Sequence, residues 1–199
     1  MHTKIKICGL SRLEDIEAVN VVKPDYIGFV FAESRRKVTP RQARELRGAL
    51  HESITPVGVF VNETIENILE LVRNNTIDMI QLHGAEDENF IEKLKSQTDA
   101  KIIKAVSIQN KGDAQKWENS SADFLLLDQK GGGTGETFDW SLIGEVAKPF
   151  FLAGGLSAKN VADAIKKISP YAVDTSSGVE ISPGVKCPEE IKKFVQNRF

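Results

Sequence analysis

Eight short apolar runs, separated by longer amphipathic stretches, are the feature that most restricts the folds open to this chain. Each run is rich in Ile, Val, Phe and Leu and is too short for a buried helix, so we expect a β-strand at each. A strict alternation of strands and helices implies a parallel sheet, because parallel neighbours need a crossover connection. The expected strands are residues 4–8, 26–31, 56–61, 79–83, 101–106, 123–128, 149–153 and 172–175.

The stretches between these strands have the periodicity of amphipathic helices. A helix is also expected around residues 113–118, where the pattern is weakest. Three helix starts are marked, one by a capping box and two by proline at the first helical position: Ser11 with Glu14, Thr39-Pro40 and Cys187-Pro188. Three apolar helix faces are clear: Ala43, Leu46 and Leu50; Ile65, Ile68, Leu69 and Val72; and Val161, Ile165 and Ile168.

Eight βα units predict a single-domain α/β protein, residues 1–199, folded as a closed (βα)8 TIM barrel. Each unit has about 25 residues, which is near the lower end for such barrels. A doubly wound open sheet is the alternative. It would need a Gly-x-Gly-x-x-Gly turn after the first strand, and the sequence there is Cys8-Gly9-Leu10-Ser11. The closed barrel is therefore favoured.

Charge and composition exclude several classes of function. A net charge of −2 gives no reason to expect nucleic acid or an anionic membrane as a partner, and no apolar run is long enough to cross a bilayer. The first residues run straight into a strand without an apolar signal region, so we expect a cytoplasmic protein. Two cysteines and three histidines without metal-site spacing predict no bound metal. A compact barrel can be a monomer or a homodimer, and both remain open.

The active site of such a barrel lies at the carboxyl ends of its strands, where this chain has polar residues and glycines. Glycines in the loops after strands seven and eight let backbone amides approach phosphate oxygens. Each loop alone could be no more than a tight turn, but the two together favour a small phosphorylated ligand. The candidates at these ends are Cys8, Arg36, Gln81, His83, Asp128, Asp174, Gly154, Gly155 and Gly178.

Three of these candidates suggest specific chemistry. Asp128 follows a run of core residues, so its carboxyl should be partly desolvated with a raised pKa, which suits a general acid; capping the next loop is the alternative. Cys8 ends the first strand and could instead fill the core. Arg36 offers a planar fork for a carboxylate, or is a solvated charge in a basic segment.

Several short motifs follow one another in order along the whole chain. After Asp128, four glycines within residues 131–135 predict a mobile flap. The segment is not a Walker loop, because no Gly-Lys-Ser/Thr ends it. The other motifs are KICGL (6–10), GFVF (28–31) with SRR (34–36), VGVFVN (57–62), QLHG (81–84), LD (127–128), GGTG (132–135) with FDW (138–140), AGGL (153–156) and DTSSGVE (174–180). Together they resemble the phosphoribosylanthranilate isomerases of tryptophan biosynthesis. Cys187 departs from the family, which more often has an acidic residue there.

The resemblance implies a barrel of the ribulose-phosphate-binding type and an Amadori rearrangement of N-(5-phosphoribosyl)anthranilate to 1-(2-carboxyphenylamino)-1-deoxyribulose 5-phosphate. It implies that Asp128 is the general acid and that Cys8, as a thiolate, is the general base. A positive environment should then lower the pKa of Cys8. By the same resemblance, Arg36 binds the anthranilate carboxylate. The partner is a small phosphorylated substrate, and no nicotinamide, magnesium or other cofactor is required.

The remaining candidates also take roles from the resemblance. His83 and Asp174 would orient the substrate, although His83 could equally be a hydrogen-bonded structural residue. The phosphate would be held largely through backbone amides by Gly154, Gly155, Ser177 and Gly178.

Two alternatives remain for function. One is the related aminoimidazole isomerase of histidine biosynthesis, which has paired aspartates at the ends of strands one and six; Cys8 argues against it. The other is a catalytically silent phosphate-binding barrel, against which the presence of both Cys8 and Asp128 argues. The fold alone does not distinguish them.

Overall fold

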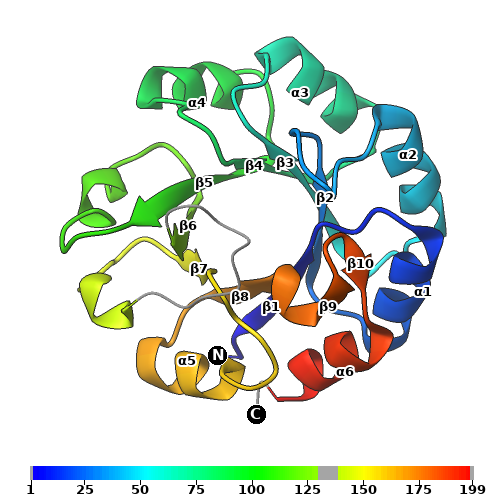
Figure 1. Ribbon diagram of the computed structural model, residues 1–199. Helices are drawn as coiled ribbons and strands as arrows, with labels where there is room; N and C mark the ends of the chain where they lie inside the picture. Colours follow the sequence, from blue (N-terminus) through cyan, green and yellow to red (C-terminus); the bar gives the residue numbers. More distant parts are fainter. Residues whose placement is uncertain (1, 130–138, 198–199) are drawn as a thin grey trace.

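The computed structural model describes residues 2–129 and 139–197, and within them eight parallel strands close into one barrel (Figure 1). Each strand pairs with its neighbours in sequence, and β8 pairs with β1 to complete the ring. The predicted closed barrel is confirmed. The strands are β1 (Lys4–Cys8), β2 (Tyr26–Val30), β3 (Thr55–Phe60), β4 (Met79–Leu82), β5 (Lys101–Ile108), β6 (Phe124–Gln129), β7 (Phe150–Leu152) and β8 (Ala172–Thr175).

Helices surround the barrel on its outside (Figure 1). In the part of the chain that the structure describes, they are α1 (Leu13–Val22), α2 (Pro40–Ala49), α3 (Ile65–Arg73), α4 (Glu88–Lys95), α5 (Val161–Ile168) and α6 (Pro188–Gln196). The glycine-rich segment 131–135, expected to form a flap, lies outside the described residues.

The helix expected around residues 113–118 is only a turn of 3₁₀ helix, η1 (Gln115–Trp117). Asp113 gives the reason, because its carboxylate accepts hydrogen bonds from the backbone N–H groups of Gln109 and Asn110 and so closes a turn before the helix. The connection after β6 contains a second such turn, η2 (Trp140–Leu142).

The predicted helix starts are right in two cases and wrong in one. α2 begins with proline after Thr39, whose side chain accepts from the N–H of Gln42, and α6 begins with proline after Cys187. The capping box of Ser11 with Glu14 does not form. Instead Asp15, whose side chain is buried, reaches back to accept from the N–H groups of Ser11 and Arg12.

Successive strand residues point alternately into the barrel and out toward the helices. The outward set forms the larger apolar core with the helices, whereas the inward set forms a separate cluster inside the ring that includes Val57, Ile103, Leu126 and Phe151. The same alternation turns the side chains of polar strand residues into the barrel: Lys6, Cys8, Gln81, Asp128 and Asp174. The pleat of the strands therefore carries polar groups into the mouth.

A short antiparallel hairpin after β8 was not predicted. The chain passes through a 3₁₀ turn, η3 (Ser177–Val179), and then forms β9 (Glu180–Ser182) and β10 (Val185–Lys186). Gly184, in the turn between them, has a φ of +85°, a conformation that side chains rarely adopt. In Figure 1 this hairpin lies beside the mouth, on the side of α1 and α6.

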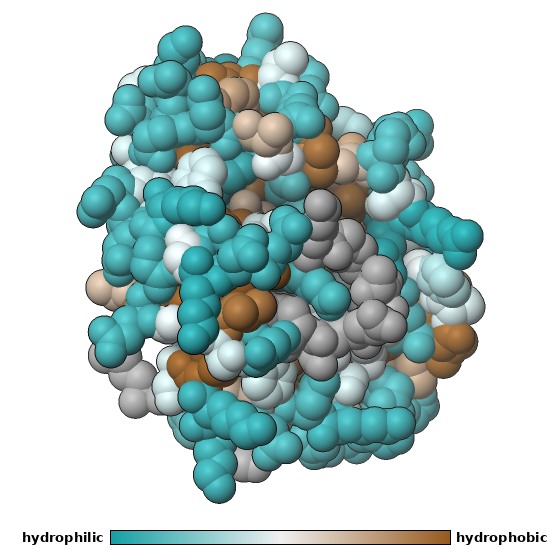
Figure 2. All heavy atoms as spheres, turned by 60° about the vertical axis from the view of Figure 1, so that its left-hand side comes forward, coloured by the Kyte–Doolittle hydropathy of each residue, from teal (hydrophilic) through white to brown (hydrophobic). Residues whose placement is uncertain are grey.

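Hydrophilic residues cover most of the outer surface that Figure 2 shows, with hydrophobic residues in small separate patches. Large exposed apolar side chains include Leu13, Val21, Val61 and Ile181, which come from different segments. No helix among residues 2–129 and 139–197 is long and apolar enough to span a membrane.

We predict that Phe151→Ala destabilises the barrel by about 3–5 kcal/mol, because the side chain is fully buried and its loss leaves a cavity. Phe151 lies inside the ring, with its aromatic ring centroid 5.4 Å from that of Tyr26 and 5.7 Å from those of Phe124 and Tyr171. Urea unfolding followed by circular dichroism measures the change. Val21→Ala, at a side chain 80% exposed, is the control and should stay within about 0.5 kcal/mol. Equal effects of the two variants would contradict the packing described.

Candidate active site

The carboxyl ends of the strands bring the predicted reactive groups together. Cys8 ends β1, Asp128 is the last residue but one of β6, and Asp174 lies in β8. His83 directly follows β4, and its N–H continues the ladder by donating to the carbonyl oxygen of Phe60 at 2.8 Å. All strands run the same way, so these side chains share one mouth.

Asp128 has the environment that a general acid requires. Its Oδ1 accepts from the N–H of Gln129 at 2.7 Å, and its Oδ2 lies 3.8 Å from Nε2 of His83. Burial raises the pKa of Asp128 to about 6, against the effect of the Gln129 hydrogen bond, and the negative charge of Asp174 acts in the same direction as burial. The raised pKa agrees with the expectation from sequence.

His83 is held by a residue of the same strand. Nε2 of Gln81 lies 2.9 Å from Nδ1 of His83, and an amide nitrogen can only donate, so in this arrangement Nδ1 accepts and Nε2 carries the ring proton. The Nε2–H group is then on the side of Asp128. Burial and the charge of Lys6 lower the pKa of His83, which favours the neutral ring.

Cys8 differs from the expectation in one respect. Burial raises the pKa of its thiol, although the nearby ammonium groups of Lys6 and Lys186 act to lower it. The expected positive environment is present, but the expected lowering of the pKa was wrong, since desolvation outweighs the lysines. Gly28 gives the thiol its room, because a Cβ at that position would stand 2.6 Å from Sγ of Cys8.

Lys6 and Asp174 form an ion pair inside the barrel, which sequence reasoning missed in part. Nζ of Lys6 donates to Oδ1 of Asp174 at 3.0 Å, and the two side chains are 0% and 9% exposed. Burial opposes the charge on Lys6, but Asp174 and Cys8 together outweigh it and raise the pKa of Lys6. The signal for Lys6 was in the sequence: it alternates with Ile5 and Ile7, so its side chain lies on the opposite face of the strand from those two apolar residues.

The two predicted phosphate loops are packed against one another. Gly154 and Gly155 both have positive φ, at +85° and +64°. A Cβ at Gly178 would stand 1.9 Å from the carbonyl oxygen of Leu156, so only glycine permits the second loop to cross the first. Thr175 joins the loops further, as its hydroxyl donates to the same oxygen at 2.6 Å.

Arg36 lies at the rim, in contact with a residue that the sequence analysis did not single out. Its Nε and Nη2 donate to Oε1 and Oε2 of Glu180 at 2.7 and 2.8 Å. Glu180 also accepts from Nζ of Lys186, which is fully buried. Glu180 is the last residue of the motif DTSSGVE (174–180), and Arg36 lies in a basic segment. An acidic residue in one motif and basic residues in another were the available signal for this ion pair.

A cavity of about 440 Å³ lies beside this arginine. Residues from the second βα loop, the phosphate loop and the hairpin line it: Arg35, Arg36, Ser177, Glu180, Ile181, Ser182 and Pro183. The cavity thus places two arginines, two apolar residues and the start of η3 around one space.

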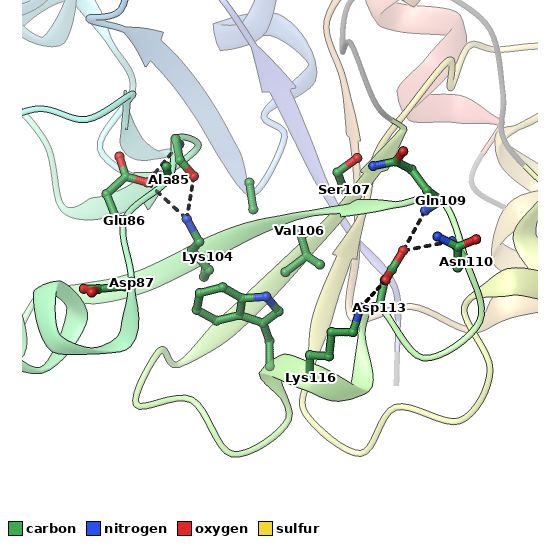
Figure 3. A pocket seen from close by; sticks show the side chains of 13 residues that line it. Ala85, Glu86, Asp87, Lys104, Val106, Ser107, Gln109, Asn110, Asp113 and Lys116 are labelled. Carbon is green, nitrogen blue, oxygen red and sulfur yellow. Dashed lines mark hydrogen bonds and ion pairs between the residues drawn. The ribbon is translucent and has the colours of Figure 1, made fainter.

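A different cavity of about 400 Å³ lies beside the ends of β4 and β5, where Figure 3 shows its side chains. Its charged groups already have partners: Nζ of Lys104 donates to Glu86 and to the carbonyl oxygen of Gly84, and the carboxylate of Asp113 pairs with Lys116. None of the predicted site residues is among the described residues that line it. We therefore place the candidate active site in the barrel mouth.

Among residues 2–129 and 139–197, no three His, Cys, Asp or Glu side chains are grouped so as to hold a metal ion. The candidate titratable groups at the mouth include a carboxyl, a thiol and an imidazole.

The fold and the site define the class first: this is a (βα)8 barrel whose candidate reactive groups lie at the carboxyl ends of its strands. A sequence model of the family described as N-(5'-phosphoribosyl)anthranilate (PRA) isomerase matches residues 5–197. The chain belongs to this family, and its activity is that of an isomerase of tryptophan biosynthesis. The resemblance predicted from the motifs is confirmed.

Individual relatives agree with this assignment. The N-(5'-phosphoribosyl)anthranilate isomerase of Endomicrobium trichonymphae is 49% identical over 197 residues, 97% of this chain and 95% of that protein. The crystal structure of phosphoribosyl anthranilate isomerase from Thermotoga maritima is similar with a TM-score of 0.90, at 38% identity over 98% of each chain. A phosphoribosyl anthranilate isomerase in complex with reduced 1-(o-carboxyphenylamino)-1-deoxyribulose 5-phosphate gives 0.87, at 37% identity over 98% of each chain.

We predict that Asp128→Asn stabilises the folded protein at neutral pH. A carboxyl whose pKa rises from 3.8 to about 6 on folding lowers the free energy of unfolding progressively as pH rises through that window. Asn does not titrate, so the variant should gain on the order of 3 kcal/mol at pH 7.5 and much less at pH 4.5. Urea unfolding at the two pH values measures the difference.

The control for this prediction is Asp123→Asn. Asp123 is bonded to the N–H of Ile102 and to Lys101, and these contacts lower its pKa despite partial burial. That variant should therefore be less stable than the wild type at pH 7.5. A loss of stability in Asp128→Asn at pH 7.5 would show that Asp128 is not desolvated as described.

Proposed function

We propose that this barrel catalyses the Amadori rearrangement of N-(5-phosphoribosyl)anthranilate with Asp128 as general acid and Cys8 as general base. The observation that carries the assignment is the raised pKa of Asp128, about 6, in a carboxyl whose strand directs it into the mouth. A carboxyl with this pKa is still protonated in a minority of molecules near neutral pH, whereas one with an ordinary pKa is almost fully ionised. Cys8, at the end of β1, faces the same mouth.

The reaction opens the furanose ring and then moves a proton from C2 to C1. Asp128 protonates the furanose ring oxygen while the anthranilate nitrogen releases its electron pair, so the C1–O bond breaks and a Schiff base forms. The Cys8 thiolate then takes the proton from C2, and the electrons of the C–H bond form the C1–C2 double bond of an enolamine. This tautomerises to the ketone when C1 gains a proton and the C2 hydroxyl loses one. No oxidant or reductant is consumed, and we expect no cofactor.

Binding is divided between two ends of the substrate. The loops after β7 and β8 would hold the phosphate with backbone amides near Gly154, Gly155, Ser177 and Gly178, and their close packing supports this. Arg36 would bind the anthranilate carboxylate. His83 and Asp174 would orient the substrate between them. One relative binds a product analogue that carries both a phosphate and a carboxyl group, which supports the division of binding between two ends.

We predict that Cys8→Ala and Asp128→Asn each lose about a hundredfold or more of kcat, the usual contribution of a positioned acid or base. The loss of fluorescence of N-(5-phosphoribosyl)anthranilate measures turnover. Cys187→Ala is the matched control, because it removes the chain's other thiol at the start of α6, outside the mouth, and should leave kcat unchanged.

The outcomes separate the parts of the proposal. An inactive wild type would overturn the substrate assignment and favour the silent phosphate-binding barrel. An active wild type with two active variants would keep the substrate and remove the catalytic pair.

We predict a plateau in the pH profile of kcat/KM. The active form has Asp128 protonated and Cys8 ionised, and it carries the same number of protons as the form with Asp128 ionised and Cys8 neutral. Its population is therefore constant between the pKa of Asp128, about 6, and the raised pKa of Cys8, and it falls tenfold per pH unit outside that range. Stopped-flow fluorescence from pH 5 to 8.5 tests this.

The shape of the profile identifies which group is needed. Activity that falls steadily above pH 6 would mean that no thiolate takes part, and activity that rises steadily to pH 8.5 would mean that no acid does. The phosphate of the substrate also titrates near pH 6. A limb caused by Asp128 disappears from the residual activity of Asp128→Asn, whereas a limb caused by the substrate remains.

A further inference from the structure

Glu180 uses only one side of the Arg36 guanidinium. A guanidinium carries five N–H donors, and Glu180 takes the one on Nε and one on Nη2. The two N–H groups of Nη1 and the second on Nη2 remain, and they form a second fork that matches a carboxylate. One arginine can thus hold a protein carboxylate at its side and a ligand carboxylate at its end.

Lys186 in turn holds Glu180. Its buried ammonium donates to Oε1 of Glu180 at 2.7 Å, and to the carbonyl oxygen and hydroxyl of Ser176 at 2.9 and 3.2 Å. The hydroxyl of Ser176 donates to the carbonyl oxygen of Cys8, so it accepts from the lysine. All three hydrogens of a charged ammonium are then in use. Two cations face one anion, which leaves the cluster a single positive charge for a ligand.

Two glycines permit close contacts with this segment, one at the side chain of Arg36 and one at the backbone of Arg35. Gly9, with a φ of +78°, lets the stem of Arg36 cross the end of β1, since a Cβ there would stand 2.5 Å from Cδ of Arg36. Gly184, at the tip of the hairpin, packs against the neighbouring backbone, where a Cβ would stand 2.7 Å from the carbonyl oxygen of Arg35. The hairpin therefore holds both the backbone and the side chain of this segment.

We propose that Glu180 is a positioning residue that selects carboxylate-bearing substrates, with Lys186 and the β9–β10 hairpin fixing it in place. Glu180 holds the Arg36 guanidinium by one fork so that the other points at the carboxylate of the substrate's aromatic ring. The cavity beside Arg36 has the apolar side chains of Ile181 and Pro183 to contact such a ring, and Ser177 of the phosphate loop in the same wall. This inference rests on the proposed function.

The test compares two substrates that differ only in the carboxylate: N-(5-phosphoribosyl)anthranilate and N-(5-phosphoribosyl)aniline. The ratio of their kcat/KM values measures what the carboxylate contributes in the transition state. In Glu180→Gln we expect this ratio to fall about tenfold or more, mainly because KM for the anthranilate substrate rises. The size of this effect is that of losing one charge-assisted hydrogen bond. The aniline substrate should change little, and so should competitive inhibition by inorganic phosphate.

Further variants guard against a folding defect. Glu180→Gln leaves Lys186 without its buried carboxylate, so we pair it with Lys186→Met in a double variant that removes both charges. Glu180→Asp keeps the charge and should recover part of the ratio. Glu33→Gln is the matched control, because Glu33 is an exposed acid of the same βα loop as Arg36, paired with Lys37, and its loss should leave the ratio unchanged.

Three results would overturn the inference. A ratio that rises in Glu180→Gln would mean that Glu180 competes with the substrate for Arg36. An equal loss with both substrates would mean that Glu180 only supports the fold. A normal ratio in the folded double variant would mean that Arg36 needs no positioning. Failure of the proposed function is distinct, because the wild type would then turn over neither substrate.

Discussion

The pairing of β8 with β1 is the constraint on which the rest of the site depends. This last parallel contact sets Lys6 opposite Asp174 and closes the ring. Inside a closed ring water is scarce, so a buried ammonium persists only with a carboxylate beside it. The closure therefore fixes a charged pair beneath Cys8. It also brings the loop after β8, which we propose binds phosphate, next to the end of β1, where the Ser176 hydroxyl donates to the carbonyl oxygen of Cys8.

Burial has opposite consequences for the two groups of the proposed mechanism. For Asp128 it raises the pKa toward neutrality, which a general acid needs. For Cys8 it raises the pKa away from the thiolate, and Lys6 and Lys186 only reduce that effect. The same depth in the barrel thus favours the acid and opposes the base. A shallower thiol would ionise more readily, but it would lose the contact with the buried lysines.

Much of the fold and of the mouth could be predicted from the sequence, for local reasons. Asp128 was recognised because it follows four apolar residues, and the loops after β7 and β8 because their glycines stand at strand ends. Strand periodicity needs no knowledge of distant neighbours.

The features that were missed depend on contacts between distant segments. Glu180 and Lys186 meet Arg36 only after the hairpin folds back, and Lys6 needs the register of β1 against β8. The error at Ser11 has a similar origin on a smaller scale. Asp15 takes the capping role because its own side chain is buried and reaches back to the N–H groups before the helix. Sequence spacing identified a plausible cap but not the competing one.

In the proposed mechanism, the fraction of molecules in the active protonation state depends on the difference between the pKa values of Asp128 and Cys8. This is because the proton must be on Asp128 and not on Cys8. A charged group that shifts both pKa values equally leaves this fraction unchanged. The Lys6–Asp174 pair shifts them oppositely: at Cys8 the lowering by Lys6 exceeds the raising by Asp174, and at Asp128 the raising by Asp174 exceeds the lowering by Lys6. One ion pair, buried at the seam of the barrel, acts as a dipole with its positive end toward the thiol and its negative end toward the acid. It therefore narrows the gap between the pKa values of Asp128 and Cys8, and part of its effect on Cys8 comes through a direct hydrogen bond from Lys6.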